Sequence, residues 1–292
     1  RVIYILLSIS VITPMLIKIE MPIVPDQYAI TAHKAISEKI NPYYCLDVIS
    51  LRWNSNFLTK DSCEEAGHNW DIKYFGDKKI LLSFDYGPST EPELGPMSFS
   101  IMKQVLLTNN EVHLVALFPT GLGMITKTVN KVKQDTLIGK SNIDFDSKIV
   151  ELGYAPGGEA VIKGMLSDIP KIFPKVKDRI KNLCDYDFIV SFSAGSPGSK
   201  EWVQFAGDQS KTECDGKIID VTTGVTAVQV TELLPYVNNG QLKGILAGLS
   251  GAASYESLLG DFGPASEKMT PQSFAHLLIV IFIIIGNITY II

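Results

Sequence analysis

Residues 187–206 read DFIVSFSAGSPGSKEWVQFA, and this stretch decides the fold class. An apolar run that resembles a buried strand leads into a turn rich in Gly, Ser and Pro, and the turn leads into a segment with helical spacing. A strand that is apolar on both faces and is followed by a helix is typical of a parallel sheet covered by helices on both sides. The stretch therefore predicts an α/β fold.

The same pattern recurs along the chain. The predicted strands are residues 79–84, 111–118, 148–152, 187–193 and 217–222. The predicted helices lie near residues 97–108, 124–137, 159–165, 199–206 and 231–237. Such alternation fits one doubly wound, mostly parallel five-stranded sheet of Rossmann-like shape, with helices on both faces and strand order 3-2-1-4-5.

Both ends of the chain are apolar. Residues 2–17 (VIYILLSISVITPMLI) and 277–292 (LLIVIFIIIGNITYII) carry no charge. A membrane-crossing helix needs roughly 20 residues, so we predict one transmembrane helix at each end. The alternative for the first segment is a cleaved signal peptide, although no small-x-small cleavage site follows it. The alternative for the second is a buried core helix, although it has no polar face.

These features predict four parts. They are an N-terminal anchor at 1–19, a linker, helix and cysteine-bearing insert at 20–78, the Rossmann-like domain at 79–262 and a C-terminal transmembrane helix at 273–292. Asp26 is the expected N-cap of the helix that follows the linker. Arg1 before the first apolar segment favours a cytoplasmic N-terminus. We therefore expect residues 20–272 on the extracytoplasmic face of a membrane.

The four cysteines allow two readings. Either all are unpaired thiols, or they form the disulfides Cys45–Cys63 and Cys184–Cys214, which would place the domain outside the cytoplasm. Cys184 and Cys214 each precede a predicted strand, and adjacent strands lie roughly 4.8 Å apart, within the range that a disulfide spans. No zinc site is expected, because the chain has no C-x-x-C pair and His68 is the only imidazole near Cys63.

The composition narrows the choice of partners. The chain has 292 residues, of which 46% are hydrophobic and 20% charged, with a formal net charge of −5. No dense Lys/Arg run is present, and binding to nucleic acid requires a basic face. We therefore expect membrane lipid and other membrane protein subunits as partners, and not nucleic acid.

The loop after the fourth predicted strand is the best candidate for a ligand site, because ligands bind beyond the carboxyl ends of parallel strands. Its backbone amides and side chains suit an anion such as phosphate or carboxylate. The candidate ligand-binding residues are Ser193, Gly195, Ser196, Gly198, Ser199 and Lys200. The alternative is ordinary turn chemistry, since neither a Walker A loop nor a G-x-G-x-x-G fingerprint occurs.

Asp85 and Glu159 are the candidate catalytic carboxylates. Asp85 ends the first predicted strand, where it would act as an acid, a base or a metal ligand, and Glu159 and Glu201 are its possible neighbours. The alternative for Asp85 is a loop-fixing hydrogen-bond acceptor. We predict no nucleophilic triad and no metal site, and the sequence does not indicate which cofactor, if any, the protein binds. No G-x-S-x-G motif occurs, and the histidines lie away from the strand ends, at His33, His68, His113 and His276.

Residues 240–253 place small side chains four residues apart, at Gly244, Gly248 and Ala252. On a helix these positions share one face and allow another helix to approach closely. The segment predicts either a tightly packed core helix or a contact surface for a partner helix.

The run from residue 79 to 259 resembles a family of uncharacterised prokaryotic membrane-anchored α/β proteins. The resemblance is carried by FDYGPSTEPELGPM, GYAPGGEAVIKGM, SAGSPGSKEWVQFA and GVTAVQVTELLPYVNNGQLKGILAGLSGAASYESLL. That family has no assigned activity, so the resemblance implies the fold and the membrane anchoring and supplies no catalytic residues. The insert with Cys45 and Cys63 departs from it.

Two functions fit these features. The leading hypothesis is a membrane-tethered α/β domain that serves as a structural or ligand-sensing component of a membrane protein assembly. The alternative is a hydrolase or transferase that acts on a phosphorylated or acidic small molecule at the carboxyl ends of the strands. The enzyme hypothesis requires that Asp85, Glu159 and Lys200 converge on one pocket.

Overall fold

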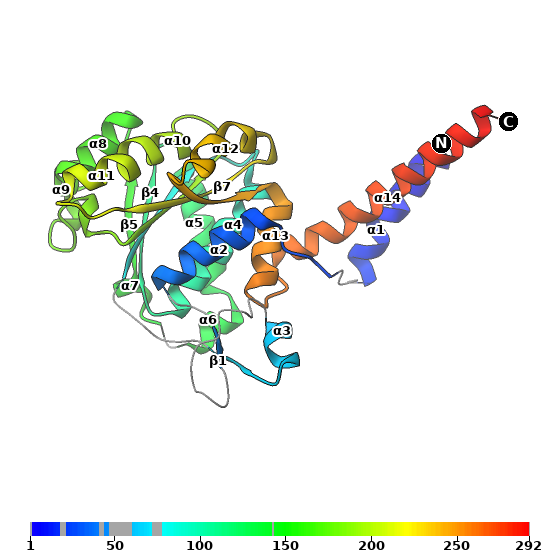
Figure 1. Cartoon of the computed structure of the whole chain (residues 1–292), viewed down its shortest axis with the longest axis horizontal. Helices are drawn as coiled ribbons and strands as arrows, with labels where there is room; N and C mark the ends of the chain where they lie inside the picture. Colours follow the sequence, from blue (N-terminus) through cyan, green and yellow to red (C-terminus); the bar gives the residue numbers. More distant parts are fainter. Residues whose placement is uncertain are drawn as a thin grey trace.

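A computed structural model describes residues 2–17, 22–40, 44–46, 60–71, 78–141 and 143–291. Its centre is a six-stranded sheet in the order β5-β4-β3-β6-β7-β8, and every neighbouring pair is parallel (Figure 1). The strands are β3 (Lys79–Asp85), β4 (Glu111–Ala116), β5 (Ile149–Tyr154), β6 (Phe188–Ser193), β7 (Asp220–Val225) and β8 (Leu242–Ala247). The predicted α/β class is confirmed.

The predicted number of strands is wrong. The five predicted strands are present and keep the predicted relative order, but β8 adds a sixth strand beside β7. The small-residue spacing of residues 240–253 predicts a helix, whereas only the second half of this segment is helical, in α13 (Gly248–Leu258). The short apolar run Leu242–Ala247 fits a buried strand equally well, and periodicity alone cannot separate the two.

Close approach at a small residue does occur, but between a helix and a strand. Gly244 lies in β8, and a Cβ atom there would overlap the backbone of Ala32 in α2 (Gln27–Ile40). Gly248 and Ala252 lie in α13, so the three residues do not share a helix face. The small side chain at position 244 therefore lets α2 pack directly on the edge strand.

Helices cover both faces of the sheet (Figure 1). One face carries α2, α4 (Glu91–Leu107), α5 (Gly121–Lys133) and α13, and the other carries α8 (Glu159–Ser167), the helical run α10–η3–α11 (199–213) and α12 (Val230–Asn238). Side chains of β3 alternate between the two apolar layers, with Leu82 on the first and Leu81 on the second. The shorter helices are α6 (Thr136–Lys140), α7 (Phe145–Lys148) and α9 (Ile169–Ile172).

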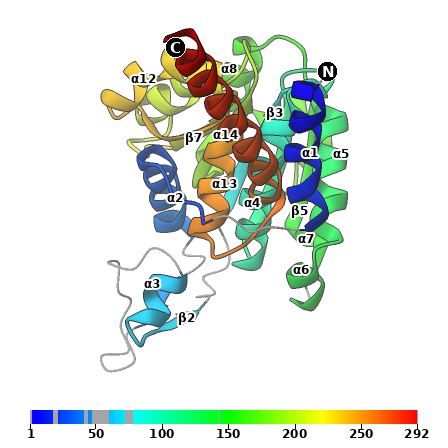
Figure 2. The same cartoon turned by 90° about the vertical axis from the view of Figure 1, so that its right-hand side faces the viewer.

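Two helices project from the domain and pack side by side (Figures 1 and 2). They are α1 (Val2–Ile17) and α14 (Pro264–Ile291), and the start of α1 lies at the same far end as the end of α14 (Figure 1). In the described part of the chain, α14 alone is long and apolar enough to cross a membrane.

The prediction of two full transmembrane helices is therefore not matched. Helix α1 has 16 residues, which at 1.5 Å per residue span about 24 Å, short of the roughly 30 Å hydrocarbon core of a bilayer. The candidate span in α14, Pro264–Ile288, begins before the predicted boundary at residue 273.

The N-terminal part contains one predicted cap and a small antiparallel sheet. The Ala29 amide donates to Asp26 Oδ1 at 2.9 Å, so Asp26 caps α2 as predicted. In the insert, β1 (Tyr44–Leu46) pairs with β2 (Asn69–Asp71), and α3 (Lys60–Glu65) lies between them in sequence. Cys63 is buried and disulfide-bonded. The side chain of its predicted partner, Cys45, lies outside the described residues.

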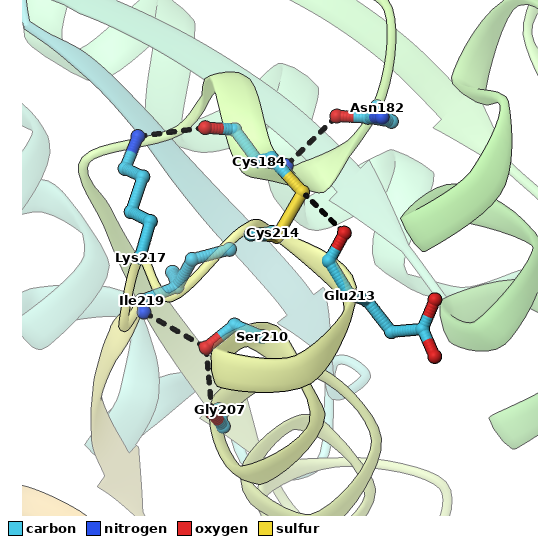
Figure 3. Close-up of a disulfide and its surroundings, with 8 residues drawn as sticks. All are labelled: Asn182, Cys184, Gly207, Ser210, Glu213, Cys214, Lys217 and Ile219. Atoms are coloured by element: carbon cyan, nitrogen blue, oxygen red, sulfur yellow. Dashed lines mark hydrogen bonds between the residues drawn. A yellow bond between two sulfur atoms is a disulfide. The ribbon is translucent and has the colours of Figure 1, made fainter.

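The predicted Cys184–Cys214 disulfide is confirmed (Figure 3). Its Cα atoms lie 5.4 Å apart, ahead of the neighbouring strands β6 and β7. Lys217 Nζ donates to the Cys184 carbonyl at 2.7 Å and closes the turn that leads into β7. The disulfide therefore links the segments that lead into β6 and β7, two neighbouring strands of the sheet.

Candidate functional site

A pocket of about 220 Å³ opens at the carboxyl ends of β6 and β7. Its lining is Ser193, Gly195, Ser196, Ser199, Lys200, Val225, Gln229, Glu232 and Leu233. The predicted ligand-binding residues all belong to this lining except Gly198, which lies in the same loop. The lining also contains residues from α12 and the turn before it, which sequence reasoning did not connect to the loop.

The loop after β6 is closed tightly on itself. Ser193 Oγ donates to the Gly195 carbonyl at 2.8 Å. A Cβ atom at Gly198 would lie 2.6 Å from that same carbonyl oxygen and would overlap the Ser193 hydroxyl. Only glycine therefore fits at position 198, and its role is to let the loop fold beneath the pocket.

The rim of the pocket carries an ion pair. Lys200 Nζ lies 2.8 Å from Glu232 Oε2, and the two side chains are 41% and 56% exposed. The hydrogen bond that Lys200 donates to the Glu232 carboxylate raises the pKa of Lys200 above its ordinary value. Lys200, which the sequence predicts as the partner of a bound anion, is therefore already paired with a carboxylate of the protein itself.

Glu201 occupies the other groups that were expected to hold an anion. Its Oε2 accepts the Gly198 amide at 2.7 Å, and its Oε1 accepts the Ser196 hydroxyl at 2.6 Å. With two carboxylates and one ammonium group around the loop, the site does not favour a lone phosphate or carboxylate.

Asp85 is fully buried beneath the strand ends. Its carboxylate accepts hydrogen bonds from the Leu117 amide at 2.8 Å, the Ser83 hydroxyl at 2.7 Å and the Trp202 indole at 3.0 Å. Burial raises the pKa of Asp85 to about 7, against the opposing effect of these bonds. The carboxylate ties β3 to the end of β4 and to the helix after β6, and it does not line the pocket.

Hydroxyl groups link Asp85 to the pocket wall. Ser191 Oγ lies 3.5 Å from Asp85 Oδ2 and 3.4 Å from Ser199 Oγ. Ser199 Oγ also contacts the Thr223 hydroxyl, which donates to the Ser191 carbonyl at 2.7 Å. Ser191 and Thr223 were missed from the sequence. The available signal was the hydroxyl side chains inside two otherwise apolar strands.

The two candidate catalytic carboxylates have separate partners. Glu159, the first residue of α8, is 56% exposed and lies 3.5 Å from Lys163. Asp85 is buried in its own network, and Lys200 is paired with Glu232. The geometry therefore does not assemble these residues into one acid–base set. Among the described residues, no cluster of three or more His, Cys, Asp or Glu side chains is placed to hold a metal.

The usual dinucleotide position of a Rossmann-type sheet is also occupied by the protein itself. That position lies at the start of the helix after the first strand, here α4, where backbone amides would meet phosphates. The first turn of α4 carries Glu91 and Glu93, and Glu93 Oε2 accepts the Ala227 amide at 3.1 Å. Two carboxylates at this helix start would repel a pyrophosphate.

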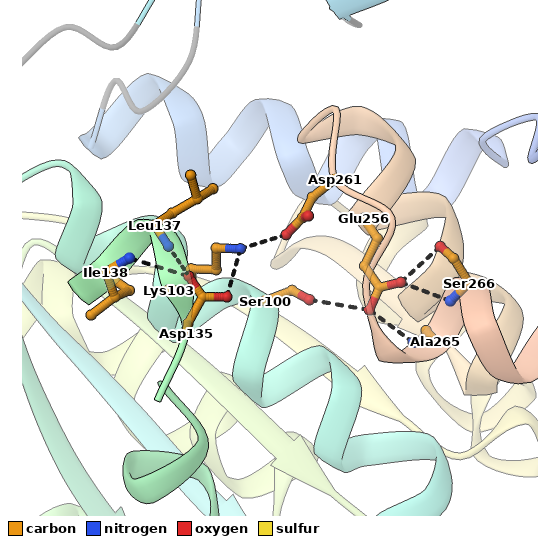
Figure 4. Close-up of polar contacts among 9 residues, drawn as sticks. All are labelled: Ser100, Lys103, Asp135, Leu137, Ile138, Glu256, Asp261, Ala265 and Ser266. Carbon is orange, nitrogen blue, oxygen red and sulfur yellow. Dashed lines mark hydrogen bonds and ion pairs between the residues drawn. The ribbon is translucent and has the colours of Figure 1, made fainter. Parts of the chain in front are cut away.

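A second polar cluster joins the domain to α14 (Figure 4). Glu256 in α13 is buried, and its carboxylate accepts the backbone amides of Ala265 and Ser266 at 2.9 and 2.7 Å. These amides belong to the first turn of α14, where no intrahelical partner exists, so Glu256 caps the helix from outside. Burial raises the pKa of Glu256, although the hydrogen bonds from Ala265 and Ser266 oppose the shift.

Lys103 completes this cluster. Its Nζ lies 2.6 Å from Asp261 and 3.0 Å from Asp135, and the residue is 5% exposed. Asp135 is itself the N-cap of α6, while Asp261 belongs to the connection between α13 and α14. The lysine of α4 therefore holds the base of α14 against the body of the domain.

Comparisons with known proteins give one partial similarity. No family model matches the chain, and no solved structure matches it. The chain is 28% identical over 152 residues to the carbamoyl phosphate synthase large chain of Vibrio parahaemolyticus and 27% identical over 152 residues to that of Vibrio cholerae. In each case the match covers 47% of this chain and 14% of the relative. The resemblance to a membrane-anchored α/β family stays a prediction.

Proposed function

We propose that this chain is a membrane-tethered α/β domain that serves as a ligand-sensing component of a membrane protein assembly. The observation that carries the proposal is α14, an apolar helix whose first turn is capped by the buried Glu256 of the domain. The helix and the domain are thereby joined without a flexible linker. A conformational change in the domain can therefore be transmitted to α14 through the hydrogen bonds of Glu256.

The surface of α14 supports the tether. Leu277, Ile283 and Ile288 are 57%, 58% and 51% exposed. Within the apolar stretch of α14, 6% of the residues are buried against the rest of the protein. A continuous apolar surface of this kind marks contact with lipid or with another protein. Membrane lipid and partner subunits are therefore the proposed surroundings of α14 and of α1 beside it.

The disulfide supports an extracytoplasmic domain. Structural disulfides persist in oxidising compartments, and Cys184–Cys214 joins two central strands of the sheet. Helix α14 projects from the domain with α1 packed against it, so a membrane crossed by α14 would separate its far end from the domain (Figure 1).

One observation favours the alternative of a hydrolase or transferase. Asp85, with a pKa of about 7, is linked by Ser191 to the pocket residue Ser199, an arrangement able to move a proton. The ionisable groups of the pocket lining, Lys200 and Glu232, are nevertheless paired with each other. The similarity to carbamoyl phosphate synthase large chains covers 14% of those proteins and transfers no activity.

A charge placed in α14 tests the tether. We expect Ile281→Arg to release the full-length protein from the membrane fraction, since an arginine in the middle of a membrane helix costs about 2.5–3.5 kcal/mol of insertion. Ile218→Arg is the matched control, because Ile218 is a 53% exposed isoleucine on the domain. The tether is wrong if wild type is already recovered in the soluble fraction, or if both variants stay in the membrane.

Thiol labelling tests the orientation. With intact cells, a membrane-impermeant reductant followed by an impermeant maleimide should label Cys184 and Cys214. Labelling that appears only after the membrane is broken would place the domain in the cytoplasm. For the assembly itself, purification in mild detergent should recover partner subunits in a fixed ratio, whereas a monomer that turns over a small molecule would favour the enzyme.

A further inference from the structure

We propose that the pocket at the ends of β6 and β7 binds a small zwitterion of the α-amino acid class, with its carboxylate on Lys200 and its ammonium group on Glu232. This inference rests on the proposed ligand-sensing function and names the ligand that would be sensed. It replaces the anion that the loop sequence alone predicted.

The opposite charges at the rim carry the inference. Lys200 Nζ and Glu232 Oε2 lie 2.8 Å apart at the mouth of the pocket. In an α-amino acid the ammonium and carboxylate groups are attached to the same carbon, so one small molecule carries both of the charges that the two rim side chains would attract. Such a ligand can insert between the two side chains and replace one internal ion pair with two pairs of its own.

The rim pair is easily opened. Both side chains are about half exposed, and an exposed ion pair contributes roughly 0–1 kcal/mol to stability. A ligand therefore gives up little when it separates Lys200 from Glu232. The charge-assisted hydrogen bonds that it forms are stronger than neutral ones, and more so where the pocket walls exclude water.

Single charges fit the pocket less well. A lone anion on Lys200 would face Glu232 across the rim and Glu201 beside the loop, both of which repel it. A lone cation on Glu232 would face Lys200. A zwitterion satisfies both ends, so the charge pattern selects for it.

The inner wall suits the remainder of such a ligand. Val225 and Leu233 are buried and offer an apolar surface, while Ser193 and Ser199 place buried hydroxyl groups in the same wall. The volume of about 220 Å³ is below the roughly 300–1,000 Å³ of pockets that hold drug-sized ligands. The pocket therefore fits a compound of amino acid size with a short aliphatic or hydroxyl-bearing side chain.

Calorimetric titration of the full-length protein in detergent micelles tests the inference. The probes are the twenty free amino acids taken singly, their N-acetyl and carboxamide derivatives, and inorganic phosphate. We expect saturable binding of at least one small amino acid, and a loss of about tenfold or more in affinity for either derivative. Lys200→Met and Glu232→Gln should each weaken binding by about tenfold or more.

Lys34→Met is the matched control, because Lys34 forms an exposed pair with Glu38 on α2, away from the pocket. It should leave the affinity unchanged, and circular dichroism should show that all variants are folded. Three results would overturn the inference: no amino acid binds, the single-charge derivatives bind equally well, or phosphate binds and only Lys200→Met weakens it. None of these results would affect the membrane retention of the protein, so the tether is judged separately.

Discussion

Two of the lysines that pair with carboxylates, Lys103 and Lys200, differ mainly in burial. Lys103 at the base of α14 is 5% exposed and lies between Asp135 and Asp261. Lys200 at the pocket rim is 41% exposed and faces Glu232. Removing one partner from a buried pair leaves a charge that water cannot solvate, whereas removing one from an exposed pair leaves a hydrated charge.

The difference assigns the two sites different tasks. The Lys103 cluster, together with Glu256, fixes one geometry between the domain and α14. The Lys200–Glu232 pair can open, so it can exchange its internal partner for a ligand. Burial, and not the type of residue, separates the joint from the binding site.

The largest expected effect on stability is that of Asp85, a buried carboxyl group that lies next to the exposed pocket. Its pKa of about 7 is raised from 3.8 by burial, so the protonated form is favoured in the folded protein. The corresponding stability is fully present below pH 4 and is lost as the pH rises through about 7. By linkage the loss is on the order of 4 kcal/mol. Urea unfolding at several pH values measures it.

Asp85→Asn isolates this contribution, since the amide does not titrate. The difference between wild type and variant should change with pH in the stated window. If wild type and Asp85→Asn have parallel pH profiles, the buried carboxylate does not titrate near neutrality, and burial is not decisive at this position.

Lys103→Met should destabilise the protein by about 2 kcal/mol, because the half-buried carboxylates of Asp135 and Asp261 would be left facing each other without the ammonium group between them. Lys34→Met, at an exposed pair, should change the unfolding free energy by less than about 0.5 kcal/mol. Urea unfolding followed by tryptophan fluorescence reports both. Equal effects would contradict the distinction between buried and exposed pairs.

Gly263→Ala tests the Glu256 cap without removing a charge. A Cβ atom at position 263 would lie 2.6 Å from the Glu256 carboxylate, so the carboxylate must leave the first turn of α14. We expect a loss of about 1–3 kcal/mol, the effect of leaving buried amides unpaired. Gly123→Ala in α5, where a Cβ meets open space, is the control. An unchanged unfolding free energy in Gly263→Ala would show that the Glu256 cap does not fix α14.

A small effect on stability is expected at the pocket rim. Lys200→Met should change the unfolding free energy of the ligand-free protein by less than about 1 kcal/mol, since the pair with Glu232 is half exposed. The same variant should lose most of its amino acid affinity. A large loss of stability would mean that the pair holds α12 in place and is not free to open for a ligand.

Local patterns account for what the sequence predicted correctly. The apolar runs of five strands and their helical partners repeat at short range, and an α/β sheet of this kind has few allowed strand orders, so neighbours such as β6 and β7 could be predicted. The Cys184–Cys214 bond followed from that adjacency. The strand-end loop could be placed at a pocket for the same reason.

Local ambiguity accounts for the errors. Residues 242–247 are apolar and small, and this short run satisfies both helix and strand spacing, so the edge strand β8 was missed. The described part of α1 covers 16 residues, fewer than the roughly 20 that a membrane-crossing helix needs, so the prediction of a second span is not matched. At Gly244 the small residue was recognised, but the element that approaches it was not.

The sequence by itself determined the α/β class, the apolar C-terminal helix and the polar loop after β6, because each depends on residues that are neighbours in the chain. Only the tertiary structure decided which charged side chains pair with each other. Lys103 pairs with Asp261, which is 158 residues away in the sequence, and Lys200 pairs with Glu232, which lies in a different helix. Whether a lysine ends in a buried or an exposed ion pair is determined by packing between distant segments, and that packing places both charges at the predicted anion loop.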